Sequence, residues 1–179
     1  TDMFYPDGQV REEDYEFTAF LGSKMHTAGV RCVDCHEPHT SKLRVPGNLM
    51  CMACHGNTMT NGAPRIDPAT HSHHKPETAG DLCTDCHMPT TVYMQRHPRH
   101  DHGFTVPDPR LTKELGIPNA CNRCHEDKPV EWAIASTDQW YGAKMESRQR
   151  IRARVISAAQ TGKAGSLEAL LDLFRQEDI

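Results

Sequence analysis

The sequence predicts a mostly irregular and α-helical fold that is organised around covalently attached groups and ends in an α-helical hairpin. Three observations predict it. A five-residue motif with two cysteines and a histidine recurs four times. Large apolar side chains are scarce, with 37% hydrophobic and 6% aromatic residues and a mean hydropathy of −0.66. Helical patterns dominate only after Pro129.

The repeated motif is Cys-x-x-Cys-His, the attachment signature of c-type haem. Two thiols separated by two residues can form thioethers to the vinyl groups of one porphyrin, and the adjacent histidine then binds the iron as its proximal ligand. The motifs supply the thioether cysteines Cys32, Cys35, Cys51, Cys54, Cys83, Cys86, Cys121 and Cys124 and the proximal ligands His36, His55, His87 and His125. All 8 cysteines are used. The sequence therefore predicts four haem c groups, each with an iron, in a tetrahaem cytochrome c fold.

Zinc knuckles and disulfides are the two other interpretations of paired cysteines. A zinc site needs two pairs per metal, but it does not need a histidine after every second cysteine. Disulfides do not need the two-residue spacing. A histidine follows the second cysteine in all four motifs, and this regularity favours haem.

The pattern divides the chain into three parts. Residues 1–30 are predicted to form a turn and then a helix from Arg11 to Met25. Residues 31–128 are the predicted tetrahaem domain, with loops expected at 60–70 and 97–110. Little regular secondary structure is expected there, because the macrocycles supply the apolar area that the side chains lack. The form without haem should be largely unfolded.

Residues 129–179 are predicted to be an α-helical tail. Its first helix runs from Glu131 to Tyr141, and a hairpin follows over 145–160 and 166–177. Apolar residues recur at helical spacing in the last helix, at Leu167, Leu170, Leu171 and Phe174. We expect this face to pack on the haem domain, to dock on another protein, or to belong to a longer chain.

Eight histidines remain as candidates for the sixth position on each iron. His39 lies too close to His36 to reach the opposite face of the same iron, so a neighbouring haem is its expected partner. Asp101 can orient the imidazole of the next residue, His102. The predicted distal ligands are His39, His71, His74 and His102, with His26 as the first reserve, whereas His73, His97 and His100 are expected in solvent or on propionates. Met25, Met88 and Met94 are alternative axial ligands, but packing is the commoner role of methionine near haem.

Several runs together resemble a family of bacterial multihaem c-type cytochromes whose cytochrome module precedes HEAT or tetratricopeptide repeats. These runs include GVRCVDCHEPHTSKLRVPGNLMCMACH, CTDCHMPTTVYM and LGIPNACNRCHEDKPVEWA, and the resemblance covers roughly residues 4–141. It implies an exported electron-transfer protein and supports the four predicted distal histidines. Family members often carry further upstream motifs and a longer repeat array. The helices from residue 145 therefore look like the start of such an array.

Electron transfer through four closely spaced bis-histidine haems is the predicted function, without enzymatic activity. We expect redox partner proteins, and end-to-end association into a conductive extracellular filament is a further expectation. The alternatives are a haem enzyme that reduces a small oxyanion or a metal, and a periplasmic shuttle bound to an enzyme complex. A net charge of −4 does not suggest a nucleic-acid partner, and no apolar run is long enough for a membrane span. The expected location is periplasmic or extracellular, with a leader removed or lying upstream.

Overall fold

The computed structural model describes residues 3–13, 15–56 and 62–176. The chain forms two compact units. The middle unit is Glu16–Phe104, and the terminal unit combines Thr1–Tyr15 with Thr105–Ile179. The first three haem motifs lie in the middle unit, and the fourth lies in the terminal unit. These limits differ from the boundaries expected after residues 30 and 128.

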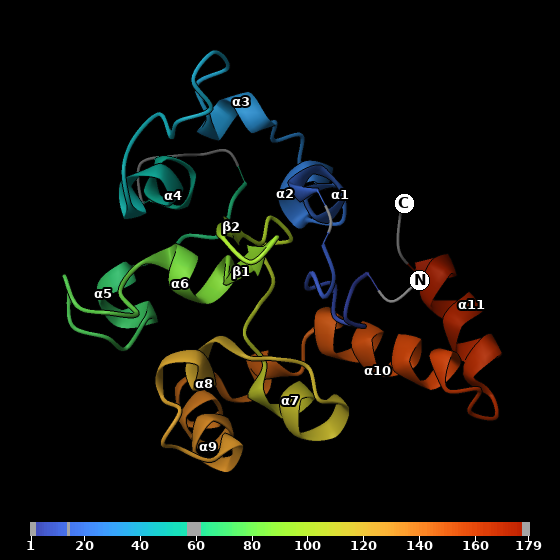
Figure 1. Cartoon of the computed structure of the whole chain (residues 1–179). Helices are drawn as coiled ribbons and strands as arrows, with labels where there is room; N and C mark the ends of the chain where they lie inside the picture. Colours follow the sequence, from blue (N-terminus) through green and yellow to red (C-terminus); the bar gives the residue numbers. More distant parts are fainter. Residues whose placement is uncertain (1–2, 14, 57–61, 177–179) are drawn as a thin grey trace. The chain divides into compact units, whose positions relative to one another are not determined.

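Short helices and one small sheet make up the middle unit (Figure 1). No described helix of this unit is longer than the 8 residues of α4. The elements are α1 Glu16–Leu21, α2 Lys24–Thr27, α3 Cys32–Cys35, α4 Asn48–His55, α5 Pro68–His71, α6 Cys83–His87, β1 Thr90–Tyr93 and β2 His97–His100. The expectation of sparse regular structure around the first three motifs agrees with this arrangement.

Two local predictions for this region are wrong. The helix expected from Arg11 to Met25 begins only at Glu16 and is broken after Leu21, because Ser23 caps a new helix by accepting a hydrogen bond from the His26 N–H at 3.1 Å. The loop expected over 97–110 instead begins with β2, which pairs antiparallel with β1. The β1 sequence Thr-Thr-Val-Tyr has high strand propensity and recruits this partner.

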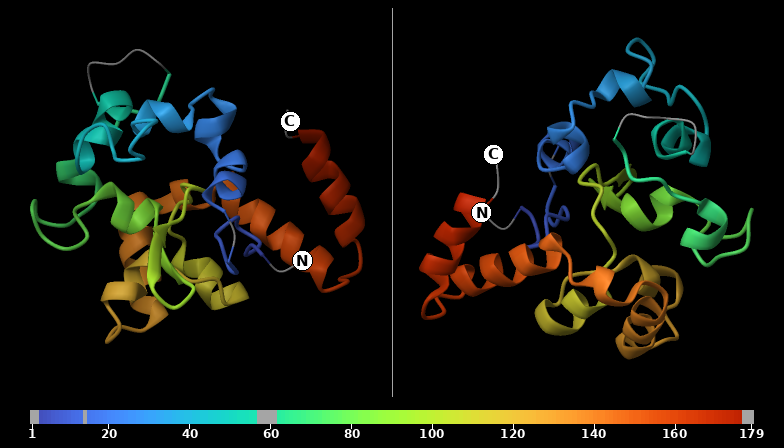
Figure 2. Two further views of the ribbon diagram at one scale, coloured as in Figure 1. Left: turned by 45° about the horizontal axis from the view of Figure 1, so that its top comes forward. Right: turned by 180° about the vertical axis from the view of Figure 1, so that it is seen from behind.

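The terminal unit is more regularly helical. Its elements are α7 Pro109–Leu115, α8 Ala120–Cys124, α9 Val130–Tyr141, the 3-10 helix η1 Gly142–Met145, α10 Arg148–Gln160 and α11 Ser166–Gln176. The helix predicted to end at Tyr141 is α9, and the two later predicted helices correspond to α10 and α11. These two helices contact each other, and in both views of Figure 2 they diverge from the turn that joins them.

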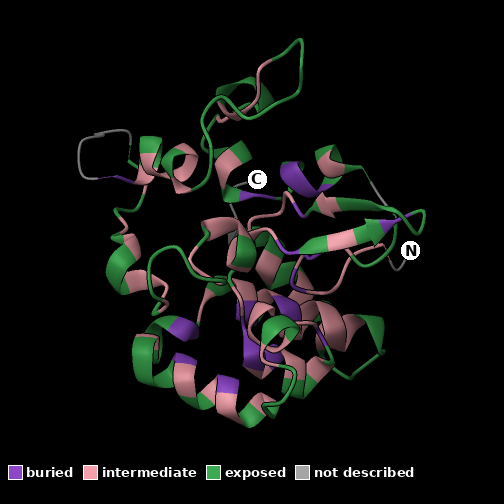
Figure 3. Cartoon of the chain, turned by 60° about the vertical axis from the view of Figure 1, so that its left-hand side comes forward, coloured by how far each residue is buried: buried purple, intermediate pink, exposed green. Residues whose placement is uncertain are grey.

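A small apolar core lies in the terminal unit (Figure 3). Leu111 and Ala153 are fully buried and Ile117 is nearly so, with Tyr5 and Leu115 packed against them. The N-terminal turn joins this unit through Gln9, whose Nε2 donates to the carbonyl of Pro118 at 3.0 Å. Within the residues described, no helix is both long and apolar enough to cross a membrane.

A buried ion pair joins the start of α7 to α10. The guanidinium of Arg150 donates to Asp108 through Nε at 2.6 Å and through Nη2 at 2.8 Å. The two side chains are only 5% and 4% exposed. Arg150 also contacts Glu146 at 3.0 Å, and Glu146 in turn accepts from Arg154. The network holds α7, η1 and α10 together because each buried charge has a partner.

Replacing Arg150 by alanine should lower the free energy of unfolding by about 3–5 kcal/mol, because the Asp108 carboxylate would stay buried without its partner. Urea unfolding followed by far-ultraviolet circular dichroism measures the loss. The matched control is Arg175→Ala, which removes an exposed pair with Asp172 and should cost less than about 1 kcal/mol. Equal effects of the two substitutions would show that the buried pair does not stabilise this unit.

Candidate haem sites

Each Cys-x-x-Cys-His motif contains a short helical segment. The two cysteines of a motif are three residues apart, so their side chains lie on one face of the helix. His55 and His87 end α4 and α6, whereas His36 and His125 directly follow α3 and α8. None of the eight cysteines is paired in a disulfide, so each is available for a thioether. Each motif therefore presents two thiols and an imidazole from the end of one helical turn.

Backbone carbonyls orient two of the proximal imidazoles. Nδ1 of His36 lies 2.9 Å from the carbonyl oxygen of Ser41, and Nδ1 of His55 lies 2.8 Å from that of Pro64. A carbonyl oxygen only accepts hydrogen bonds, so Nδ1 must carry the proton in both rings. The lone pair of Nε2 is then available for a metal. This is the tautomer that a proximal haem ligand needs.

Two predicted distal histidines lie close to predicted proximal ones. The ring centroids of His102 and His36 are 6.2 Å apart, with an interplanar angle of 34°. The ring centroids of His71 and His87 are 6.0 Å apart, and the two ring planes are nearly parallel, at an angle of 13°. Both separations exceed the contact distance of about 3.5–4.0 Å between packed carbon atoms. The rings of each pair are therefore close without touching face to face.

The separation within each pair fits one iron between two imidazoles. A metal–imidazole bond is about 2 Å long, and the ring centre lies about 1 Å beyond the bound nitrogen. Two rings on opposite sides of one iron are then about 6 Å apart, which agrees with the 6.2 Å and 6.0 Å of the two pairs. Nδ1 of His102 also donates to the carbonyl of His100 at 2.8 Å, which leaves its Nε2 free.

Burial favours the neutral form of both distal candidates. It is the largest cause that lowers the pKa of His71, and the neighbouring His87 lowers it further. Burial is also the largest cause that lowers the pKa of His102. A neutral imidazole is the form that binds a metal, so the environment of these two rings prepares them as ligands.

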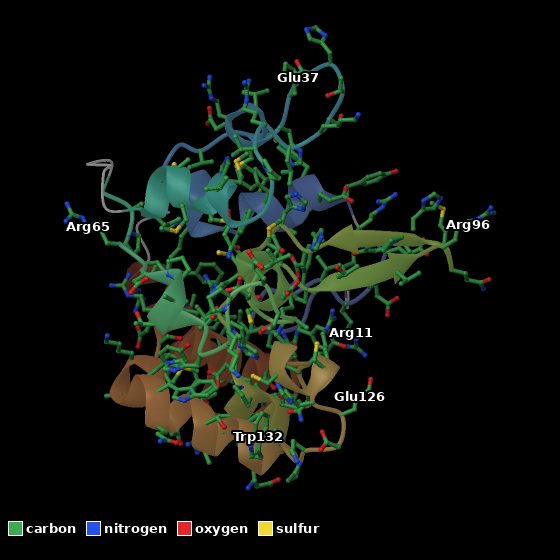
Figure 4. The ribbon with its side chains drawn as sticks, turned by 90° about the vertical axis from the view of Figure 1, so that its left-hand side faces the viewer. Arg11, Glu37, Arg65, Arg96, Glu126 and Trp132 are labelled. Carbon is green, nitrogen blue, oxygen red and sulfur yellow. The ribbon has the colours of Figure 1, made fainter. Side chains whose placement is uncertain are left out.

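The other predicted distal ligands are placed differently. His39 is exposed on the turn after α3, where its backbone N–H donates to the Glu37 carboxylate at 3.0 Å; Figure 4 shows Glu37 on this loop. His74 is half-buried, its Nδ1 donates to the Ser72 carbonyl at 2.8 Å, and its ring packs against Gly80.

The reserve His26 and the three histidines left unassigned are all exposed. The ring of His26 meets Phe20 edge to face at 5.5 Å between centroids. Nδ1 of His100 donates to the Met88 carbonyl at 2.7 Å, so Nδ1 carries the proton, as in His36, His55 and His102. His100 lies on β2, which pairs with the strand that follows the third motif.

The surface of the middle unit fits large apolar groups. Among its described residues, the buried apolar side chains are Ala19, Phe20 and Tyr93. Apolar side chains next to the motifs are instead exposed, namely Val33, Leu43, Val45, Leu49 and Leu82. Leu49 adjoins the second motif and is 66% exposed. A porphyrin attached at each motif would cover such side chains, so the residues present fit the haem groups.

The fourth motif lies against an aromatic side chain of its own unit. The ring centroid of His125 lies 4.7 Å from that of Trp132 on α9, and Figure 4 labels Trp132. Asn119 caps α8 by accepting from the Asn122 N–H at 3.1 Å, and its amide donates to the Thr112 hydroxyl at 2.8 Å. The α8 motif is therefore tied to both α7 and α9.

In the middle unit, the thiols of successive motifs lie close enough to shift one another's pKa. Burial raises the pKa of Cys35, and the nearby thiol of Cys54 raises it further. A hydrogen bond between the thiols of Cys51 and Cys83 raises the pKa of Cys51 and lowers that of Cys83. The second motif thus lies beside the first through Cys35 and beside the third through Cys83.

In the part of the chain described, no group of three or more His, Cys, Asp or Glu residues could hold a bare metal ion.

Comparison with known families agrees with this chemistry. The cytochrome c552 family matches residues 63–177, which contain the third and fourth motifs. A doubled CXXCH motif matches residues 26–60, which contain the first and second. The chain belongs to the cytochrome c552 family and is a multihaem c-type cytochrome that acts in electron transfer. No curated protein and no solved structure matches it.

The mass of the denatured, haem-loaded chain should exceed that of the polypeptide by four haems, because thioether bonds survive denaturation. Replacing both Cys121 and Cys124 by alanine should remove one haem and leave the other three, since the fourth motif lies in a separate compact unit. Intact-protein mass spectrometry measures both values. A wild-type mass with three haems or fewer would contradict the assignment of all four motifs.

Proposed function

We propose that the chain is a tetrahaem electron-transfer protein in which both axial positions of each iron are filled by histidine. The observation that carries the proposal is the separation of about 6 Å between two imidazoles at each of two sites. His36 and His102 would hold the first iron, and His87 and His71 would hold the third. In each pair, one histidine belongs to a motif and the other is one expected on the distal side.

The second and fourth irons take His55 and His125 as proximal ligands. His39 and His74 remain the proposed distal ligands for these sites, with His26 in reserve. Nδ1 of His74 is bonded to a carbonyl, which supports a ligand role because Nε2 is then unprotonated. His39 lies on an exposed turn, so binding to an iron would require this turn to reposition.

The side chains of the protein bind, orient and protect the groups that change redox state. Haem c supplies an iron that gains or loses one electron. Carbonyls of Ser41, Pro64 and His100 hold the imidazole protons on Nδ1, which fixes the rings and strengthens Nε2 as a donor. Two histidines on one iron exclude oxygen and other small molecules from it and favour a low potential relative to a methionine ligand.

The neighbouring thiols support an order for the first three sites. Cys35 acts electrostatically on both Cys51 and Cys54, and Cys51 is hydrogen-bonded to Cys83, which supports the second haem as a neighbour of both the first and the third. We propose that electrons pass along the middle unit in this order. This arrangement gives the path two ends, at the first and third motifs, where redox partner proteins can exchange electrons.

Export and assembly follow from the same chemistry. Thioether attachment to haem takes place outside the cytoplasm, which supports a periplasmic or extracellular location. We propose that α10 and α11 are a helical hairpin that begins a HEAT-like or tetratricopeptide array. Exposed Leu167, Leu171 and Phe174 line α11 and suit such a continuation or a second protein. End-to-end assembly into a conductive filament would extend the same relay between chains.

Catalytic reduction is the second candidate function. The match to the cytochrome c552 family favours it, because cytochromes of the c552 type include nitrite reductases. Catalysis needs an iron with one open axial position, and the exposed turn that carries His39 is where such a position would arise. The two functions therefore differ in whether a small ligand can bind a reduced iron.

Replacing His102 by methionine should raise the potential of one haem and leave the others nearly unchanged. A thioether ligand favours the reduced iron more than an imidazole does, and axial ligands set haem potentials over about 0.8 V, so a rise on the order of 100 mV is expected. A spectroelectrochemical titration measures it. His97→Met on the exposed strand β2 is the control and should leave the titration curve unchanged. An unchanged curve for the His102 variant would remove His102 from the ligands.

Carbon monoxide should not bind rapidly to the dithionite-reduced protein, because histidines fill both axial positions. The absorption spectrum after addition of the gas tests this. Rapid binding at one haem per chain would contradict a pure relay and would favour the reductase. In that case the His39→Ala variant tests whether His39 competes for the open position. Unchanged carbon monoxide binding in this variant would show that His39 never filled that position.

A further inference from the structure

The helices that carry the second and third motifs meet through the side chain of Asn48. This residue opens α4 and lies three positions before Cys51. Its Oδ1 accepts from the backbone N–H of Cys83 at 2.8 Å, and its Nδ2 donates to the carbonyl of Asp81 at 3.0 Å. Both hydrogen bonds are partly buried and join segments 33 and 35 residues apart. The amide therefore uses a donor and an acceptor to bridge the two motif segments.

The acceptor half of this bridge replaces a missing helix cap. The first N–H groups of a helix have no partner inside it and are commonly satisfied by the side chain of the N-cap residue. The N-cap of α6 is Leu82, which has no polar side chain. By contrast, Asp34 satisfies the Arg31 N–H at the start of α3, and Asn119 caps α8. Among the described motif helices, α6 thus receives its cap from the helix of another motif.

A second contact places the same two helices together. Helices α4 and α6 contact each other, and the thiols of Cys51 and Cys83 are hydrogen-bonded. Conversion of both sulfurs to thioethers removes their protons and ends this bond. The hydrogen bonds of Asn48 involve no sulfur, so they persist after attachment. Asn48 then supplies a polar link between α4 and α6 that is independent of the cofactors.

We propose that Asn48 is a positioning residue that sets the distance and mutual orientation of the second and third haems. The proposal rests on the proposed attachment of haem at these two motifs. Without the amide, α6 loses its cap and α4 loses its hydrogen bonds to residues 81 and 83. The thioethers still hold each haem to its own helix, but the two helices can shift against each other.

Circular dichroism in the Soret band tests this, because coupling between neighbouring haems depends on their separation and angle. The variants are Asn48→Leu, which keeps the approximate size without polar atoms, and Asn48→Asp, which keeps the acceptor for the Cys83 N–H. Asn48→Leu should retain four haems by mass and its bis-histidine absorption spectrum, but it should lose part of the Soret couplet. Asn48→Asp should retain more of the couplet. Asn119→Ala, which removes the local cap of α8, should leave the couplet unchanged.

Three outcomes would overturn the inference. The first is an unchanged couplet in Asn48→Leu with all four haems attached. The second is an equal change in Asn119→Ala, which would show a general effect of losing a cap. The third is loss of the second or third haem from both Asn48 variants, which would assign the residue to attachment. Failure of the proposed function gives a different result: one of the two motifs would carry no haem already in the wild-type chain. Peptide mass mapping of the wild-type chain detects this.

Discussion

The middle unit cannot build a hydrophobic core from its own side chains, and the rest of its structure depends on this constraint. Its buried apolar residues in the described part are few, while apolar side chains beside the motifs are exposed. Attached macrocycles supply the missing apolar area. The terminal unit differs because Leu111 and Ile117 form a core and Arg150 pairs with Asp108 inside it. One chain thus combines a part organised by cofactors with a part stabilised by ordinary packing.

Backbone hydrogen bonds give the sites their precision. His36 and His55 of the motifs and the candidate ligand His102 donate from Nδ1 to a carbonyl, so the fold fixes both the proton and the direction of the ring. The motif helices are short and need caps, and each described cap comes from a different source. Arg31 and Asp34 cap the first motif locally, Asn119 caps the fourth, and Asn48 reaches the third from α4. The hydrogen bond that caps α6 therefore also fixes the position of the third motif relative to the second.

The sequence was sufficient for features set by short-range spacing. It predicted the four motifs and α9, α10 and α11, because these depend on neighbouring residues and helical periodicity. It named His71 and His102 as distal ligands but could not assign them to an iron, because the approach of His102 to His36 depends on the path of a long intervening segment. It also missed the break at Ser23, where a cap outweighs an amphipathic pattern, and the bridge through Asn48, which joins residues far apart in sequence.

The proposed relay requires histidine at both axial positions of every iron. Low-temperature electron paramagnetic resonance of the fully oxidised protein, with the spins counted per chain, tests this most directly. We predict that all four irons are low-spin, as two strong-field imidazoles require. A high-spin ferric signal amounting to one iron per chain would contradict it, because that iron would have a weak or absent sixth ligand and could serve catalysis instead of relay.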